Sequence, residues 1–187
     1  MNKIQRIIYC SFAILLLLYL FLPNQPFPEP PDYFLQSYEP ADVESSLRRG
    51  YYNDSKRQDV INYYRTKFDS FSFFGENFQI FSFNLNYPPE DSQNLIRDQT
   101  RSTYLEELVH PLRESFFING FEPARDNDQI FINDHHYCQK TIVKKVETGL
   151  LERVVVGVTA LISIYILIFC WNEFSRKFFS KYHGNFK

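Results

Sequence analysis

The stretch VVVGVTALISIYILIFCW, from Val154 to Trp171, decides the architecture of this chain. It carries no charged residue over a length close to the ~20 apolar residues that a helix needs to cross a bilayer. A buried helix of this length in a soluble protein has a polar face, which is missing here. Trp171 stands where an interfacial aromatic residue belongs. We therefore predict a transmembrane helix over residues 151–171.

A second apolar block, IIYCSFAILLLLYLFL, runs from Ile7 to Leu22. Its basic start, with Lys3 and Arg6, fits either a cleaved secretory signal or an uncleaved anchor. A signal ends in small residues before the cleavage point, whereas this block ends in Phe-Leu-Pro. We therefore favour an uncleaved transmembrane helix over residues 7–22, after a short cytoplasmic N-terminus of residues 1–6.

The basic residues that flank the two blocks predict their orientation. They gather before the first block and after the second, and none occurs between Leu22 and Arg48. Cytoplasmic flanks of transmembrane helices are enriched in Lys and Arg. We therefore expect the protein in the cell membrane, with both termini in the cytoplasm. The central part is then extracytoplasmic. The flanking basic residues are Lys3, Arg6, Arg176, Lys177, Lys181 and Lys187.

Charge and cysteine content exclude two further kinds of protein, those that bind nucleic acid and those held together by disulfides. The net charge is −2 over 187 residues, so we expect no nucleic-acid partner. Cys10 and Cys170 fall inside the apolar blocks, which leaves Cys138 alone in the exported part. A single thiol cannot form an internal disulfide, so the exported domain must be held together by packing.

The exported part begins with a proline-rich segment, residues 23–34, which is typical of a semi-rigid linker. A docking peptide for an aromatic groove is the alternative. Residues 35–148 then alternate between helical and strand-like patterns. This order predicts an α+β domain with an antiparallel sheet and helices on one face.

Individual segments of that domain carry distinct signals. Residues 53–68 predict a helix with Ser55 and Gln58 as a capping box, and a shorter helix is expected over residues 41–49. Residues 77–87 alternate as in a half-buried strand, and residues 88–111 have prolines where a helix begins and ends.

Further along, the pair Asn119 and Gly120 predicts a turn. Residues 129–133 and 138–147 predict two strands on either side of a polar segment. That polar segment contains the residues of the exported part that are best suited to metal binding or catalysis.

The segment FINDHHYCQK, residues 131–140, raises the question of a metal site. Asp134, His135, His136 and Cys138 are all able to bind a cation, and Zn²⁺ takes three or four such ligands. On a strand, however, neighbours point to opposite faces, so the two histidines diverge. The spacing matches no known pairing of zinc ligands, and we favour a solvated hairpin turn over a metal site.

Two catalytic interpretations are weaker. A nucleophilic pair of His136 and Cys138 needs an orienting group and an oxyanion site, and no glycine-rich stretch lies nearby. Glu106 and His110 are four apart on the helix expected at residues 88–111, which favours an ordinary surface pair. We predict no catalytic residue and no cofactor.

The tail, residues 172–187, combines aromatic and basic residues at helical spacing. This pattern suits a helix lying in the inner headgroup region, and ordinary stop-transfer flanking is the alternative. The predicted membrane-interface residues are Trp171, Phe174, Arg176, Lys177, Phe178, Lys181 and Tyr182. In the second apolar block, Thr159 and Ser163 beside Gly157 offer a close helix contact, with the first block or with a second copy.

The run LNYPPEDSQNLIRDQTRSTYLEELVHPLRESFFINGFEP, from Leu85 to Pro123, resembles uncharacterised membrane-anchored proteins of candidate-phylum bacteria with small genomes. The resemblance contains no motif of known mechanism. It implies a bacterial cell membrane and supplies neither an activity nor site residues.

These observations favour a membrane-anchored structural or interaction module of the cell envelope. Its expected partners are the lipid bilayer and another membrane or envelope protein, or a second copy of the chain. The alternatives are an accessory subunit of a membrane transport or export complex, and a protein similar to polysaccharide chain-length regulators, which share this layout of spans by topology alone.

Overall fold

The computed structural model describes residues 2–73, 76–96 and 102–183. It divides into two compact units, and each is described by itself. One unit consists of Met1–Pro23 and Thr148–Lys187, and the other of Asn24–Glu147.

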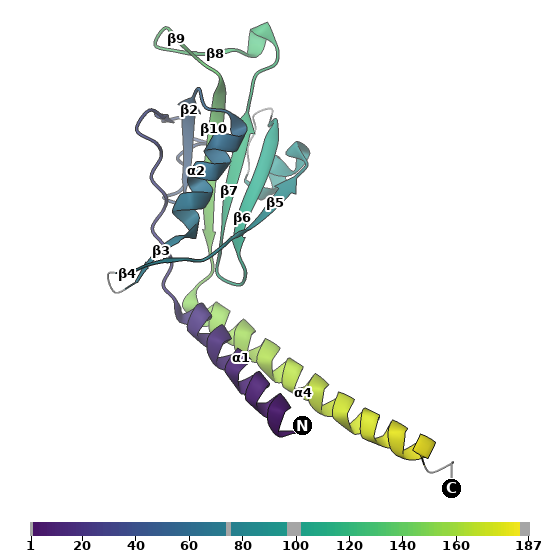
Figure 1. Cartoon of the computed structure of the whole chain (residues 1–187). Helices are drawn as coiled ribbons and strands as arrows, with labels where there is room; N and C mark the ends of the chain where they lie inside the picture. Colours follow the sequence, from purple (N-terminus) through teal and green to yellow (C-terminus); the bar gives the residue numbers. More distant parts are fainter. Residues whose placement is uncertain (1, 74–75, 97–101, 184–187) are drawn as a thin grey trace. The chain divides into compact units, whose positions relative to one another are not determined.

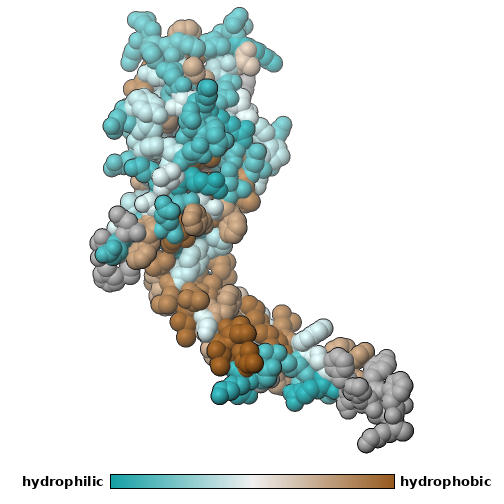
Figure 2. Space-filling model, viewed as in Figure 1, coloured by the Kyte–Doolittle hydropathy of each residue, from teal (hydrophilic) through white to brown (hydrophobic). Residues whose placement is uncertain are grey.

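The first unit is a pair of helices, α1 (Lys3–Phe21) and α4 (Leu150–His183). Helix α1 begins with a capping box in which Asn2 and Gln5 each bond the backbone of the other. Stretches Lys3–Phe21 and Leu150–Phe178 are long and apolar enough to cross a membrane, as predicted, and their exposed surfaces are hydrophobic in Figure 2.

Contacts between α1 and α4 depend on a glycine. Gly157 is buried, and a Cβ atom there would lie 2.3 Å from Cδ1 of Leu20, so the missing side chain lets the two helices approach. The Tyr9 hydroxyl donates to the carbonyl oxygen of Leu161 at 2.9 Å. Thr159 and Ser163 are exposed and donate to their own helix, so within one chain they do not form the close contact predicted for them.

The central unit is built on a six-stranded sheet in which every pairing is antiparallel (Figure 1). This confirms the predicted α+β class. The strand order is β1-β2-β10-β7-β6-β5. The bounds are β1 Leu35–Ser37, β2 Arg48–Asn53, β10 Gln139–Glu147, β7 Glu114–Phe121, β6 Tyr104–His110 and β5 Phe83–Tyr87.

Among the residues that the structure describes, the sheet is accompanied by helix α2 (Arg57–Asp69), two small hairpins and three short helical elements. The hairpins pair β3 (Ser70–Phe73) with β4 (Glu76–Gln79), and β8 (Ile130–Ile132) with β9 (His135–Tyr137). The helical elements are η1 (Pro89–Asp91), α3 (Ser92–Leu95) and η2 (Asp126–Asp128).

Helix α2 (Arg57–Asp69) covers one face of the sheet (Figure 1). Its apolar residues recur at helical spacing, and they form the main core with side chains from β2, β6, β7 and β10. The core consists of Phe34, Tyr51, Val60, Ile61, Tyr64, Phe68, Tyr104, Leu108, Phe116, Ile118 and Val143.

The proline-rich segment is part of this packing. Phe27 contacts Phe116 with ring centroids 5.7 Å apart, and the Tyr63 hydroxyl of α2 donates to the carbonyl oxygen of Glu29. The segment interpreted as a linker from its sequence therefore packs along the domain.

The opposite face of the sheet has a smaller core. Ile96 and Leu95, which follow η1, pack there on Leu105, Phe117 and Ile142. The prediction that helices lie on one face is therefore correct for α2 and wrong for the short η1 and α3 elements.

Strand β10 defines the two ends of the domain. At its last residues, Lys145 contacts both Gln25 and Glu147, so both chain connections leave the domain at this end, which we call the exit end. The β8–β9 hairpin lies where β10 begins, at the end we call the hairpin end (Figure 1). The nine residues of β10 separate the two ends by about 30 Å.

Several predictions about segments were wrong. Residues 88–111, expected as one helix, form η1, the one-turn α3 and strand β6, with residues 97–101 outside the described part. Asn119 and Gly120 lie inside β7 and form no turn. The expected strand over residues 77–87 is divided between β4 and β5, and Phe83 and Leu85 are exposed.

Two helix predictions also changed. Residues 41–49 form turns and the start of β2. Helix α2 is present, but Lys56 is its N-cap and no side chain caps it. Ser55 instead donates its backbone N–H to Oδ1 of Asn53.

Candidate functional site

The polar segment identified in the sequence forms the β8–β9 hairpin at the hairpin end. Ile132 pairs with His135, so Asn133 and Asp134 make a two-residue loop. Both have positive φ, 50° and 62°, which is the geometry of a type I′ turn and is better tolerated by Asn and Asp than by most residues. The prediction of a turn here is confirmed.

The four candidate metal ligands separate on this hairpin. His135 Nε2 lies 3.1 Å from Oδ2 of Asp54, and the backbone N–H of Cys138 donates to the other oxygen of Asp54. His136 instead contacts the side-chain oxygen of Gln129 at 2.6 Å. Asp134 occupies the turn. No group of three or more His, Cys, Asp or Glu side chains in the described residues is placed to hold a metal ion.

Asp54 also influences the only thiol of the central domain. Burial, the negative charge of Asp54 and a hydrogen bond to its carboxylate together raise the pKa of Cys138 above its ordinary value. A raised pKa lowers the thiolate fraction at neutral pH, so Cys138 is exposed but weakly nucleophilic. The arrangement does not favour a nucleophilic pair with His136.

The hairpin forms one side of an open pocket of about 330 Å³, which lies on the sheet face opposite α2. Its apolar wall comes from β8 and the end of β7, and its polar wall comes from β2, β10 and the β1–β2 connection. The lining residues are Glu39, Tyr52, Phe121, Gln129, Ile130, Phe131, Ile132 and Lys140.

Lys140 organises the polar wall of this pocket. Its Nζ lies 2.8 Å from Oδ2 of Asp42 and 3.1 Å from Oε2 of Glu39. The Tyr52 hydroxyl donates to Oε1 of Glu39 at 2.6 Å. This bond, with Lys140, lowers the pKa of Glu39 despite partial burial. Gly50 makes the arrangement possible, since a Cβ there would lie 2.6 Å from the Asp42 carboxylate.

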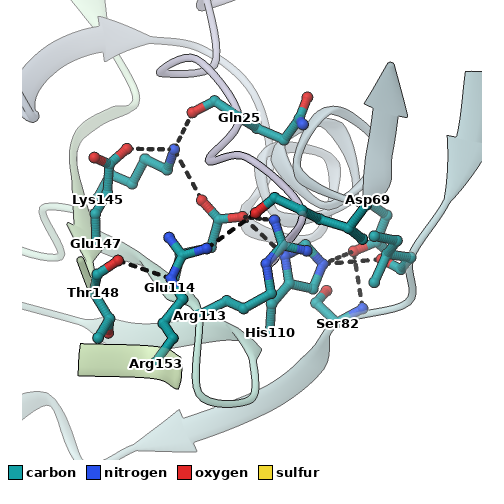
Figure 3. A network of polar contacts seen from close by, with 12 residues as sticks. Gln25, Asp69, Ser82, His110, Arg113, Glu114, Lys145, Glu147, Thr148 and Arg153 are labelled. Carbon is teal, nitrogen blue, oxygen red and sulfur yellow. Dashed lines mark hydrogen bonds and ion pairs between the residues drawn. The ribbon is translucent and has the colours of Figure 1, made fainter. Parts of the chain in front are cut away.

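The exit end contains a second polar cluster, which lies inside the domain (Figure 3). Lys145 Nζ lies 3.0 Å from Oε2 of Glu114 and 2.7 Å from Oε1 of Glu147, and it also donates to the carbonyl oxygen of Gln25. The side chains of Lys145 and Glu114 are both fully buried.

His110 extends the cluster towards α2. Its Nε2 donates to the carbonyl oxygen of Ile80 at 2.9 Å, and its Nδ1 faces Oε1 of Glu114 at 3.5 Å. The ring stacks on Phe68, with centroids 4.2 Å apart and an angle of 8° between planes. The Asp69 carboxylate lies 3.7 Å from Nε2 and accepts the backbone N–H of Ser82.

Charge pairing favours the ionised form of Glu114. Burial opposes the charge of Glu114, but bonds from His110 and Lys145 and the positive charges of Lys145 and Arg113 outweigh burial, so the pKa of Glu114 lies below its ordinary value. Sequence reasoning placed His110 on a surface helix, whereas it is a buried residue of β6.

The predicted membrane-interface residues lie on α4. Trp171 and Phe178 are exposed, and the ring of Phe174 lies between theirs, with centroids 6.2 and 6.0 Å away. The Arg176 guanidinium contacts Glu173 at 2.5 Å. Lys177 is exposed, and the side chains of Lys181 and Tyr182 lie outside the described part. The role of this set stays a prediction.

Trp171 also borders a groove of about 560 Å³ between α1 and α4. The groove is mostly apolar, but the Gln5 side-chain amide donates to Asn172 Oδ1 at 3.4 Å across it. Asn172 in turn donates to the carbonyl oxygen of Ile168. Polar side chains in an apolar helix pair are costly unless they bond to each other or to a partner.

No protein-family model matches the chain, and neither a curated protein sequence nor a solved structure matches it.

Proposed function

We propose that this chain is a membrane-anchored interaction module of the cell envelope. In this proposal α1 and α4 cross the cell membrane, both termini are cytoplasmic, and the sheet domain is extracytoplasmic. The hairpin end contacts another membrane or envelope protein. The proposal assigns no catalytic chemistry to the domain.

The observation that carries the proposal is the exposed Phe131 on a two-stranded ribbon beside an open pocket. Phe131 is 65% exposed, on the hairpin that extends past the end of the sheet (Figure 1). Exposed aromatic residues beside a pocket are typical anchors of protein interfaces. Both chain connections to α1 and α4 leave the domain at the exit end, and neither leaves at the hairpin end.

A second candidate, an accessory subunit of a transport or export complex, is favoured by the groove between α1 and α4. Gln5 and Asn172 face each other there at the edge of hydrogen-bonding distance. A transmembrane helix of a polytopic partner, packed in the groove, can offer such side chains further bonds. The similarity to chain-length regulators rests on the layout of spans alone.

Site-specific photo-cross-linking tests the favoured function. A benzophenone amino acid replaces Phe131 in the full chain, expressed in bacterial membranes, and Thr66 on the exposed side of α2 receives the same substitution as a control. The proposal expects one discrete adduct with a different protein from position 131 and none from position 66. Equal or absent adducts at both positions contradict it, and an adduct with a second copy indicates self-association instead.

Cys138 provides an independent test of topology. It is the only cysteine outside the two apolar helices and it is exposed. A membrane-impermeant maleimide added to intact cells at pH ~8.5, where more of the thiol is ionised, should label Cys138 without lysis. Labelling that occurs only after lysis places the domain in the cytoplasm and contradicts the proposed orientation.

A further inference from the structure

The exit end of the domain exposes apolar side chains from four separate segments. Phe78 lies on β4, Phe81 precedes β5, Phe83 begins β5, Leu112 lies in the turn between β6 and β7, and Val146 lies near the end of β10. Phe81 and Phe83 are 77% and 64% exposed, and Phe78, Leu112 and Val146 are 54%, 46% and 42% exposed. We call these five residues the apolar rim.

Leu112 is exposed in the rim although its backbone conformation is unfavourable for a leucine. Its φ is 63°, in the left-handed region where a bulky residue is disfavoured and Gly, Asn or Asp are usual. The neighbouring turn residue Arg113 is buried, while Leu112 is directed outwards. The turn therefore exposes the apolar side chain and buries the charged one.

A group of buried charged side chains lies near the rim, while Glu76 on β4 and Glu147 on β10 are exposed. Four ionisable side chains near the rim are each at most 3% exposed and belong to the cluster in Figure 3, namely His110, Arg113, Glu114 and Lys145. The ordinary pattern in water is the reverse, with charges exposed and large apolar groups covered. The hairpin end differs in exposing Arg125, Asp126 and Asp134 beside its one large exposed aromatic residue, Phe131.

The two chain connections that leave the exit end are short. Strand β10 ends at Glu147 and α4 begins at Leu150, while α1 ends at Phe21 and the domain unit begins at Asn24. Two intervening residues in each connection can span only about 10 Å. If α1 and α4 cross a bilayer, the exit end is therefore held at its surface.

We propose that the apolar rim inserts into the interfacial region of the bilayer and seats the domain on the membrane. The inference rests on the membrane-anchored part of the proposed function and is independent of the partner at the hairpin end. Apolar side chains gain by entering the headgroup and acyl boundary, and the cluster beneath them removes charges that would oppose insertion.

A second copy of the chain is the competing occupant. The rim follows the end of the domain through β4, β5, the turn between β6 and β7, and β10. Both chain connections leave at this end, which favours the bilayer as the occupant.

The test places one fluorophore at a time in the full chain. Cys10, Cys138 and Cys170 are changed to serine, and Phe81→Cys, Phe83→Cys or Phe131→Cys carries an environment-sensitive nitrobenzoxadiazole label. Phe131 is a matched control, because it is 65% exposed against 64% for Phe83 and lies at the opposite end of the domain. The protein is reconstituted into phosphatidylcholine and phosphatidylglycerol vesicles with or without doxyl-labelled lipid.

The proposal expects quenching by doxyl lipid at positions 81 and 83 at least twofold stronger than at position 131, with blue-shifted emission. Equal quenching at all three positions overturns it. A blue shift without lipid quenching, which grows with the protein-to-lipid ratio, assigns the rim to a second copy and also overturns it. Flotation of the vesicles is checked first, because a chain that does not float contradicts the membrane anchoring and not the rim alone.

Hydroxyl-radical footprinting of the unmodified chain gives a second measurement. In vesicles, oxidation of Phe81 and Phe83 should fall at least threefold relative to Phe131. A ratio near one contradicts insertion without depending on any substitution.

Discussion

The ammonium group of Lys145 lies 3.0 Å from the carboxylate of Glu114, and neither side chain has any exposed surface. Two strands that are far apart in the sequence, β7 and β10, supply the pair. Such a pair stabilises a fold weakly compared with apolar packing, but removing one partner leaves the other as an uncompensated buried charge. The exit end should therefore be sensitive to single substitutions in this cluster.

Lys145→Met should destabilise the domain by about 3–5 kcal/mol, because Glu114 loses its principal cation. Thermal unfolding of the full chain in detergent, followed by near-ultraviolet circular dichroism, measures the loss. Lys67→Met, at an exposed site on α2, is the matched control and should change the melting temperature little. Equal effects of the two substitutions would show that the buried pair is not formed.

The same cluster predicts a dependence of stability on pH. The pKa of folded Glu114 lies below the ordinary value of 4.5, so its charge stabilises the fold above that value, and this contribution is lost as the pH falls through the folded pKa. Glu114→Gln should therefore lower the melting temperature at pH ~7 and approach the wild type as the pH falls below the folded pKa of Glu114.

The comparison with Glu114→Gln at each pH isolates this carboxyl from the others, which titrate in both proteins. A difference in melting temperature that stays constant between pH ~7 and pH ~3 would show that Glu114 does not change its charge on unfolding in this way.

Local patterns in the sequence were sufficient for α2 and β10, because the first has an apolar stripe of helical period and the second has a run of β-branched residues, Thr141 to Val143. They failed for β6, whose segment TYLEELVH has leucines and glutamates at helical spacing. Glu106 and Glu107 are accommodated on a strand by Arg57 and by the Tyr87 hydroxyl, which lie 49 and 20 residues away. No local pattern shows such partners.

In the candidate site, too, local features were predictable and contacts between distant residues were not. The turn at Asn133 and Asp134 was predictable from its own residues. The contact between Asp54 and Cys138 joins residues 84 positions apart, and the pairing of Glu114 with Lys145 depends on strand register. These distant contacts could not be inferred from spacing in a single sequence.

Gly120 was expected in a turn but lies inside strand β7, and this position gives a further prediction. It lies opposite Tyr104 in the sheet, and a Cβ atom there would lie 2.0 Å from two carbons of the tyrosine ring. Gly120→Ala should therefore destabilise the domain by about 1–3 kcal/mol, because the buried ring must move. Thermal unfolding measures the loss.

The control for this substitution is Gly149→Ala, whose added Cβ meets only the end of the exposed Glu152 side chain. That variant should remain close to the wild type. In a Tyr104→Ala background the cost of Gly120→Ala should disappear, and a cost that persists would contradict the ring contact as its cause.

Asp54→Asn should make Cys138 more reactive. Burial is the largest cause of the raised pKa of Cys138, and the charge of Asp54 and a hydrogen bond to its carboxylate raise it further. Asparagine keeps an oxygen that can accept the Cys138 backbone N–H but carries no charge, so the thiolate fraction at pH ~7.5 should rise and maleimide labelling should accelerate about two- to fivefold. Rates are measured on the full chain with Cys10 and Cys170 changed to serine.

Asp134→Asn removes the same charge from the hairpin turn and should leave the rate near that of the wild type. If both variants accelerate labelling equally, the general charge of the hairpin end controls the thiol and the direct contact with Asp54 does not.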